Sequence, residues 1–334
     1  MKKFEEFCYM TQQGIKEYMK SYLTSKKYEV IDEDGFLYAK GDVPVLLVAH
    51  MDTVHKELCT KIIKSKDVLY SSQGIGGDDR CGVFIIANIV KNHHCSVVLL
   101  EDEEIGTVGA KKFAQTDYIK NLGVNFMIEF DRKGRDDAVF YTCDNKDFTK
   151  HVLDNTGYKQ QTGSFTDISV LMPASKLCGV NLSCGYYNPH TTNEYVVYSE
   201  MFETIAAAED LITAECEKPF EYVAKTYNSY GSGRQYNSYG YGYGYNYDYY
   251  DYDPYPNGGG YASSQYSKYN YKRDDLSTKA SKDTYLELVA TIIGDDGKQE
   301  YLIASGYTKA ECWLDLFTSY PSICFDDIVN YEFT

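Results

Sequence analysis

The chain has 334 residues, of which 43% are hydrophobic, and a formal net charge of −16 at pH 7. This length allows one large domain or two modest ones. The acidic balance argues against nucleic acid or an anionic membrane as the main partner, because both attract a basic face. No apolar run approaches the ~20 residues of a membrane-spanning helix, and the first residues lack the apolar centre of a secretory signal. We therefore expect a cytoplasmic protein whose ten scattered cysteines are reduced and mostly buried thiols.

Apolar runs and helical patterns alternate over roughly residues 1–220, which is typical of an α/β fold. Continuous apolar runs predict buried strands at 43–50, 96–102, 125–131 and 179–187. Helical patterns predict helices at 80–93, 106–115, 147–157 and 199–218. Ser199 is the predicted cap of the last of these helices, and Gly157 is the predicted end of the one before it.

A tyrosine-rich stretch follows this part of the chain. Nearly half of the 35 tyrosines lie between Tyr227 and Tyr271, and aliphatic residues are almost absent there. Such a composition cannot bury enough surface to offset the entropy of ordering. We therefore predict a disordered Tyr/Gly-rich linker at 226–272. Stacking of its tyrosine rings would allow weak association between copies of the chain, and so an oligomer.

Regular structure is predicted again near the end of the chain. Two strand-like runs, 284–294 and 300–306, flank a DDGK turn and predict a hairpin. A helical pattern at 308–320 and a last strand-like run at 324–333 complete a small ββαβ module over 283–334. Its role is left open.

Five short segments each place an acid or an imidazole at the end of an apolar run. They are AHMDTV (49–54), GIGGDDRCG (74–82), LLEDEEIG (99–106), IEFDRKG (128–134) and GYYNPHTTNEY (185–195). Open α/β sheets bind ligands at the carboxyl ends of their strands, so these side chains are candidates for one site. Each segment alone is a weak signal, because paired acids and lone histidines are most often structural.

Together the segments supply two histidines, one bridging aspartate, one terminal glutamate and one terminal aspartate. That set suits two Zn²⁺-like ions about 3.5–4 Å apart. His50 could ligate a metal while Asp52 fixes its tautomer. Adjacent carboxylates such as Glu103 and Glu104 repel unless a cation lies between them or one is protonated. Glu103 is then left beside a metal-bound water, where a general base must be.

In order and spacing the five segments resemble the co-catalytic dinuclear zinc exopeptidase superfamily. That superfamily includes bacterial leucyl aminopeptidases, tripeptidase T, glutamate carboxypeptidases and N-acyl amino acid deacylases, and the resemblance covers roughly residues 30–215. It implies a three-layer α/β/α sandwich around a mixed, mostly parallel sheet. The small α+β module at the end of the chain lies outside the resemblance. The resemblance also implies two divalent metal ions, Zn²⁺ first and Co²⁺ or Mn²⁺ as alternatives.

The resemblance also assigns the metal ligands. His50 and Asp131 would hold one ion, Glu104 and His190 would hold the other, and Asp78 would bridge the two.

Further roles follow from the same resemblance. Glu103 would be the general base, and Asp52 would orient His50. Asp79 would follow a strained peptide bond, and Asp167 in GSFTDISVL would help to shape the site.

The spacing of the predicted ligands along the chain narrows the choice of subfamily. The fourth and fifth ligands are 190 − 131 = 59 residues apart, too few for the lid domain of some relatives. The first histidine and the bridging aspartate are 78 − 50 = 28 apart, too few for the domain that shell-forming relatives insert. What remains is the single-domain aminopeptidase type. We therefore predict a catalytic domain at 1–220, followed by the linker and the small module.

We expect a metal-dependent hydrolase that removes N-terminal residues from peptides, using a metal-bridged water with Glu103 as its base. The acidic cleft favours a free amine, whereas Arg132, Lys133 and Arg135 could instead bind a carboxylate. Alternatives are therefore an N-acyl amino acid deacylase or a carboxypeptidase-type amidohydrolase, with an acyl-amino-acid substrate in place of a peptide. An alternative of another class is a catalytically inactive binding or assembly protein that associates through its tyrosine-rich tract.

Three histidines outside the five ligands are predicted to be exposed turn or helix-end residues: His55, His93 and His94. For His55 a place in the pocket is the alternative.

Overall fold

The computed structural model describes residues 1–226, 286–293, 298–306 and 328–333, together with Cys312, Leu316 and Tyr320. Almost all of the predicted linker at 226–272, and most of the predicted helix at 308–320, lie outside these residues.

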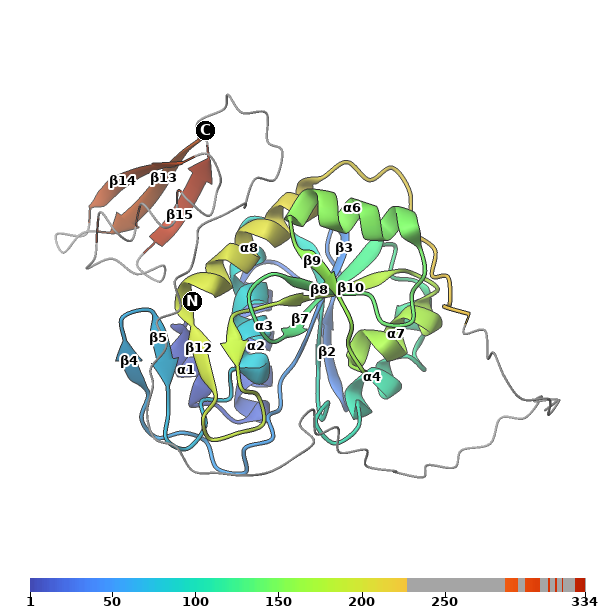
Figure 1. Cartoon of the computed structure of the whole chain (residues 1–334), viewed down its shortest axis with the longest axis horizontal. Helices are drawn as coiled ribbons and strands as arrows, with labels where there is room; N and C mark the ends of the chain where they lie inside the picture. Colours follow the sequence, from blue (N-terminus) through green and yellow to red (C-terminus); the bar gives the residue numbers. More distant parts are fainter. Residues whose placement is uncertain are drawn as a thin grey trace, which may run out of the picture. The chain divides into compact units, whose positions relative to one another are not determined.

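A mixed sheet of eight strands forms the centre of the fold, in the order β1-β2-β6-β3-β7-β10-β8-β9 (Figure 1). The strands are β1 (Val30–Glu33), β2 (Phe36–Ala39), β3 (Val43–His50), β6 (Cys95–Leu100), β7 (Phe126–Arg132), β8 (Asp137–Val139), β9 (Lys159–Gln161) and β10 (Gly179–Ser183). The four central strands, β6, β3, β7 and β10, are parallel to their neighbours within this group. Strands β1 and β2 pair antiparallel on one side and β8 on the other. The sheet is mixed and mostly parallel, as predicted.

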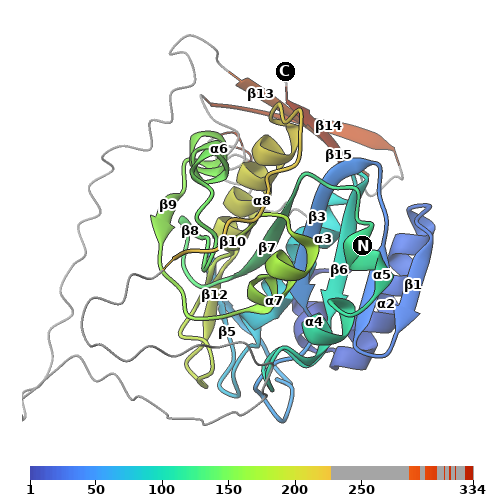
Figure 2. The same cartoon turned by 90° about the vertical axis from the view of Figure 1, so that its right-hand side faces the viewer.

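Helices cover both faces of this sheet. One layer contains α3 (Gly77–Ile89), α6 (Lys146–Thr156) and α8 (Tyr198–Thr213), with α1 (Phe4–Cys8) and α2 (Gln12–Ser25) beside them. The other contains α4 (Val108–Phe113), α5 (Asp117–Lys120) and α7 (Asp167–Ser175), which lie in front of the sheet in Figure 2. Because both faces are covered, β3 and β6 are buried along almost their whole length. The predicted three-layer α/β fold is confirmed.

A second sheet of four short strands supports the last of the five segments. Its order is β11-β12-β5-β4, made of β4 (Ile63–Ser65), β5 (Val68–Tyr70), β11 (Tyr186–Tyr187) and β12 (Tyr195–Val197). The single strand predicted at 179–187 is therefore wrong, because it is divided into β10 and β11. Gly185 causes the break: its φ is +86°, and a Cβ there would lie 2.9 Å from the backbone oxygen of Val197.

The ends of two helices test the predicted caps. Gly157 follows α6 in a left-handed conformation, with a φ of +69°, as predicted. The Ser199 cap is wrong, because the N-cap of α8 is Val197 and Ser199 lies in the first turn. The backbone N–H and the hydroxyl of Ser199 donate to the carboxylate of Asp67, at 2.9 and 2.5 Å. A distant carboxylate is a stronger acceptor for the helix start than a local hydroxyl.

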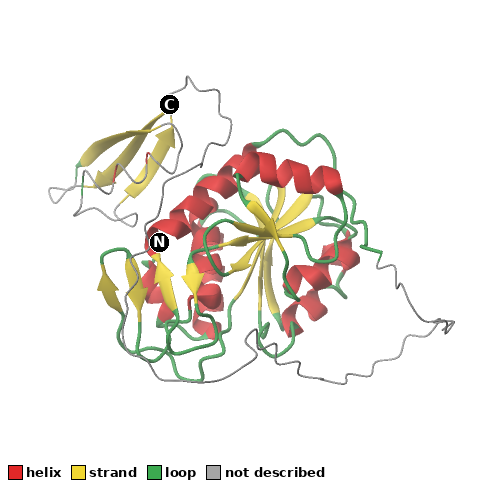
Figure 3. Cartoon of the chain, in the orientation of Figure 1, coloured by secondary structure: helices red, strands yellow, loops and turns green. Residues whose placement is uncertain are grey.

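The end of the chain forms a small separate sheet in the order β14-β13-β15 (Figure 3). Its strands are β13 (Leu286–Ile293), β14 (Gln299–Gly306) and β15 (Ile328–Phe333), and both pairings are antiparallel. The predicted hairpin and last strand are confirmed. Nine cysteines are described, and eight of them are buried. Among the helices of the described residues, none has both the length and the apolar character needed to cross a membrane.

Candidate metal centre

The five predicted metal ligands come together at one edge of the central sheet. His50 is the last residue of β3, Asp131 lies at the end of β7, and Glu104 follows β6. Parallel strands point their carboxyl ends to the same edge, which explains this convergence. Asp78 comes from the first turn of α3, and His190 from the turn between β11 and β12.

Three of these residues form what we call the His50 group: His50, Asp78 and Asp131. The Nε2 of His50 lies 3.2 Å from Oδ1 of Asp78 and 3.7 Å from Oδ1 of Asp131. The His50 side chain is 1% exposed, so the group is held inside the protein.

The His190 group consists of Asp78, Glu104 and His190. The Nε2 of His190 lies 3.2 Å from Oδ2 of Asp78 and 3.2 Å from Oε2 of Glu104. The other Glu104 oxygen, Oε1, is buried and has no hydrogen-bond partner. The His190 side chain is 56% exposed, and its φ is +63°. The second group therefore opens towards solvent.

Asp78 belongs to both groups, with Oδ1 in one and Oδ2 in the other. Hydrogen bonds from His190 and His50 hold the pKa of Asp78 well below its usual range, although burial opposes this. Hydrogen bonds to Asp78 and Glu104 raise the pKa of His190 to about 10. Burial disfavours the charged form of His50, yet its carboxylate neighbours raise its pKa well above the ordinary value. The carboxylates of each group thus favour a positive charge beside its histidine, and the nitrogen and oxygen donors fit Zn²⁺ or similar ions.

One carboxylate, Asp52, organises the loops that bear these ligands. Its Oδ1 lies 3.1 Å from Nδ1 of His50, as the predicted orienting role requires. Its two oxygens also accept the backbone N–H groups of Glu103 and Glu104, at 2.9 and 3.0 Å. Asp52 therefore fixes a ligand on β3 and the loop after β6 together.

Asp79 lies behind the metal ligands. The peptide bond between Asp78 and Asp79 is cis. The Asp79 carboxylate is fully buried and accepts the backbone N–H groups of His50 and Gly82, at 3.1 and 2.9 Å. A Cβ at Gly82 would lie 2.5 Å from Asp79 Oδ1 and 2.6 Å from the backbone oxygen of Phe130, so only glycine fits this approach of α3 to β7.

Asp131 is braced by residues that sequence reasoning did not single out. The hydroxyl groups of Thr166 and Tyr186 donate to its two carboxylate oxygens, at 2.8 and 3.0 Å. The Asn181 side chain accepts the Asp131 N–H and donates to the Asp131 carbonyl, both at 2.8 Å. These partners come from three other segments, so no local pattern could have indicated them.

The Glu103 side chain has no hydrogen bond or ion pair with any described residue. Burial and the negative charges of Asp131, Glu104 and Asp78 raise the pKa of Glu103 to about 7, against the opposing effect of His50. A carboxylate in this state can accept and release a proton near neutral pH.

Two further carboxylates lie buried beside this centre. Among the described residues, neither oxygen of Asp167, the first residue of α7, has a hydrogen-bond partner, and Oε2 of Glu129 in β7 has none either. Glu129 Oε1 accepts the N–H of Ile168 at 3.3 Å. Burial raises the pKa of both carboxyls well above the usual range, and the neighbouring carboxylates raise it further. Glu129 was missed because it lies inside an apolar strand.

The basic residues near the site are mostly paired. Arg132 contacts Asp137 at 3.2 Å, and Nε and Nη2 of Arg135 donate to Glu203 at 2.5 and 2.6 Å. Lys133 is exposed.

The three histidines that were predicted to be exposed have acidic partners. His55 lies 3.1 Å from Glu194, and its side chain is only 11% exposed. The predicted exposure of His55 is wrong, because Glu194 holds the ring inside the protein. His93 and His94 are partly exposed and lie near Glu209 and Asp42.

The architecture matches solved peptidases. Aminopeptidase PepT from Bacillus cereus superimposes with a TM-score of 0.54 and 15% identity, over 63% of this chain and 96% of that chain. A tripeptidase from Staphylococcus aureus gives a TM-score of 0.51 and 14% identity, over 63% of this chain and 95% of that chain. No protein-family model and no curated protein matches the chain. Similarity at this level concerns the fold and not the activity. This chain has the three-layer fold of those two peptidases, as its resemblance to the dinuclear zinc exopeptidases predicted.

Proposed function

We propose that the chain is a dinuclear metallo-aminopeptidase. The observation that carries this proposal is the pair of residue groups that share Asp78, with the buried Glu103 carboxyl beside them. His50, Asp78 and Asp131 would hold one divalent ion, and the His190 group would hold the other. Their donor set favours Zn²⁺, with Co²⁺ or Mn²⁺ as alternatives.

Bound divalent ions would polarise the scissile carbonyl and lower the pKa of the attacking water. Glu103 accepts the proton of that water and then returns it to the leaving amine, which its raised pKa allows. Asp52 keeps Glu103 in place through the backbone N–H at 2.9 Å and holds the tautomer of His50. The Thr166 and Tyr186 hydroxyls orient the Asp131 carboxylate.

A peptide with a free N-terminal amine is the proposed substrate. Two solved structures with a similar fold are an aminopeptidase and a tripeptidase. Arg132 and Arg135 already bind carboxylates of the protein, which leaves them less able to bind the carboxylate of a substrate. Asp167 and Glu129 add buried carboxyl oxygens that have no hydrogen-bond partner among the described residues, and an ammonium group would supply the missing donors.

The extent of the catalytic domain is also a proposal. Every proposed ligand precedes residue 220, so we assign catalysis to residues 1–220. The tyrosine-rich tract, the small module and any oligomer have no assigned part in it, and a cytoplasmic location stays a prediction.

The test compares three forms of one short peptide after loading the protein with Zn²⁺. The free peptide and its C-terminal amide should be cleaved at similar rates, and the N-acetylated form at a much lower rate. Faster cleavage of the acetylated form would reassign the protein to the deacylases or carboxypeptidases. Absence of bound metal in a fully active preparation would refute the dinuclear mechanism itself.

A further inference from the structure

Glu194 is a buried carboxylate close to the metal centre that binds no proposed ion. Its Oε2 accepts the backbone N–H of Gly76 at 2.8 Å, and its Oε1 accepts the backbone N–H of Asp78 at 2.9 Å. The side chain is fully buried. A buried backbone N–H without a partner is costly, so Glu194 stabilises the conformation of the turn that presents Asp78.

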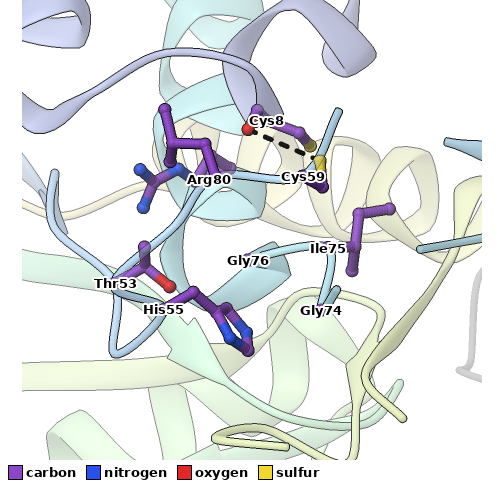
Figure 4. A pocket seen from close by; sticks show the side chains of 9 residues that line it. Cys8, Thr53, His55, Cys59, Gly74, Ile75, Gly76 and Arg80 are labelled. Atoms are coloured by element: carbon purple, nitrogen blue, oxygen red, sulfur yellow. Dashed lines mark hydrogen bonds between the residues drawn. The ribbon is translucent and has the colours of Figure 1, made fainter. Parts of the chain in front are cut away.

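His55 holds Glu194 from the other side. Its Nε2 lies 3.1 Å from Glu194 Oε2, and a carboxylate only accepts, so Nε2 carries the hydrogen. The ring lies against Gly74, where a Cβ would come within 2.2 Å of it (Figure 4). The ring therefore has little freedom to turn away from Glu194.

Glu194 also belongs to the turn that carries His190. Only three residues separate them, and the Glu194 N–H donates to the Thr191 carbonyl at 3.2 Å. Glu194 thus fixes the backbone of Asp78, one member of the His190 group, and also ends the turn that carries His190, another member. Asp52 has the same pattern elsewhere in the site, with one imidazole and two backbone N–H groups of a ligand-bearing loop.

We infer that the His55–Glu194 pair positions Asp78 relative to His190 and thereby sets the affinity of the His190 group for its ion. The two residues are positioning residues, since neither touches an ion or a substrate. The inference rests on the proposed function only in assigning two ions to the two groups. The affinity of the His50 group for its ion should depend less on the His55–Glu194 pair, because Asp78 alone connects that group to the pair.

The experiment is a Co²⁺ titration of the metal-free full-length protein, followed by absorption spectroscopy and by competition with a chelator. Glu194→Gln replaces one acceptor by an amide donor that faces a backbone N–H. The affinity for the second Co²⁺ should fall about 10- to 100-fold, as for other residues that orient metal ligands. The affinity for the first should change less, and the Co²⁺ spectrum should shift. Glu203→Gln is the matched control, because it removes the same charge at the Arg135 pair on α8.

A second pair of variants separates orientation from stability. His55→Gln keeps an N–H donor for Glu194, whereas His55→Leu removes it. The leucine variant should reproduce the loss of the second Co²⁺, and the glutamine variant should recover most of it. These variants carry the test if Glu194→Gln does not fold.

Wild-type Co²⁺ affinities and spectra in both Glu194→Gln and His55→Leu would overturn the inference. Equal losses at both ions would overturn its selective part. A wild-type protein that binds no Co²⁺ would instead count against the proposed function.

Discussion

The two metal-ligand groups share Asp78 but differ in how the fold holds them. The His50 group has ligands at the ends of β3 and β7, and its histidine is 1% exposed. The His190 group depends on a turn between two short strands, and its histidine is 56% exposed. A ligand fixed by the central sheet needs little ordering when an ion binds, whereas a ligand on a turn must be ordered at that moment. We therefore expect stepwise loading, with the His50 group tighter.

The largest effect is expected at Glu103, which belongs to neither group. Glu103→Gln should lower kcat by about 10²- to 10⁴-fold, because it removes the general base. Both groups keep their ligands, so metal content by elemental analysis should remain that of the wild type. Wild-type turnover would mean that another carboxylate is the base.

Removing one histidine at a time separates the two groups. His50→Ala leaves Asp52, Asp78 and Asp131 as buried carboxylates without their imidazole, which should cost about 3–5 kcal/mol of unfolding free energy. His190→Ala should lose only the second ion and keep the fold, since its side chain is half exposed. Denaturant unfolding and metal analysis give both quantities. Equal metal loss in the two variants would contradict stepwise loading.

Metal binding should release protons, because the neighbouring carboxylates raise the pKa of both histidines above the ordinary value. With the pKa of His190 at about 10, the affinity of its group should rise about tenfold per pH unit between pH 7 and 9. The stability of the metal-free protein should change in the opposite direction as the pH rises. The raised pKa contributes stability that is complete below pH 6.5 and is lost as the pH rises through about 10. Calorimetry in buffers of different ionisation enthalpy would count the protons, and no release would refute the assignment.

The smallest effect is expected at Asp167. Asp167→Asn should raise KM for a free-amine peptide about tenfold, which corresponds to losing ~1.4 kcal/mol of ammonium binding. Hydrolysis of the N-acetylated peptide should not change. The melting temperature should stay the same or rise, because a buried carboxyl without hydrogen bonds is replaced by a neutral amide. An equal change for both peptides would show that Asp167 only shapes the site.

Sequence reasoning succeeded where one segment carries its own signal. The apolar run at 43–50 became β3 with those bounds, because a strand covered on both faces must be continuously apolar. The convergence of the five predicted ligand residues at one sheet edge could be anticipated, because each follows such a run or a glycine turn. Glu194 could not, although it lies in the same segment as His190, because its partners Gly76 and Asp78 are more than a hundred residues away.

Other features depended on tertiary contacts of the same kind. Ser199 has the local signature of a cap, but Asp67 reaches the helix start instead. The strand predicted at 179–187 divides because the backbone of Val197 packs against Gly185. Neither contact can be read from spacing along the chain.

The shared carboxylate of Asp78 also affects how this protein can change by mutation. Loss of His190 would leave one ion site intact, and later changes could restore the other. Replacing Asp78 by asparagine takes one nucleotide and removes an acidic ligand from both groups together. A lineage with this substitution would keep the fold but lose both proposed ion sites in a single step. Among descendants that kept the proposed peptidase activity, Asp78 should therefore be the last of the five proposed ligands to vary.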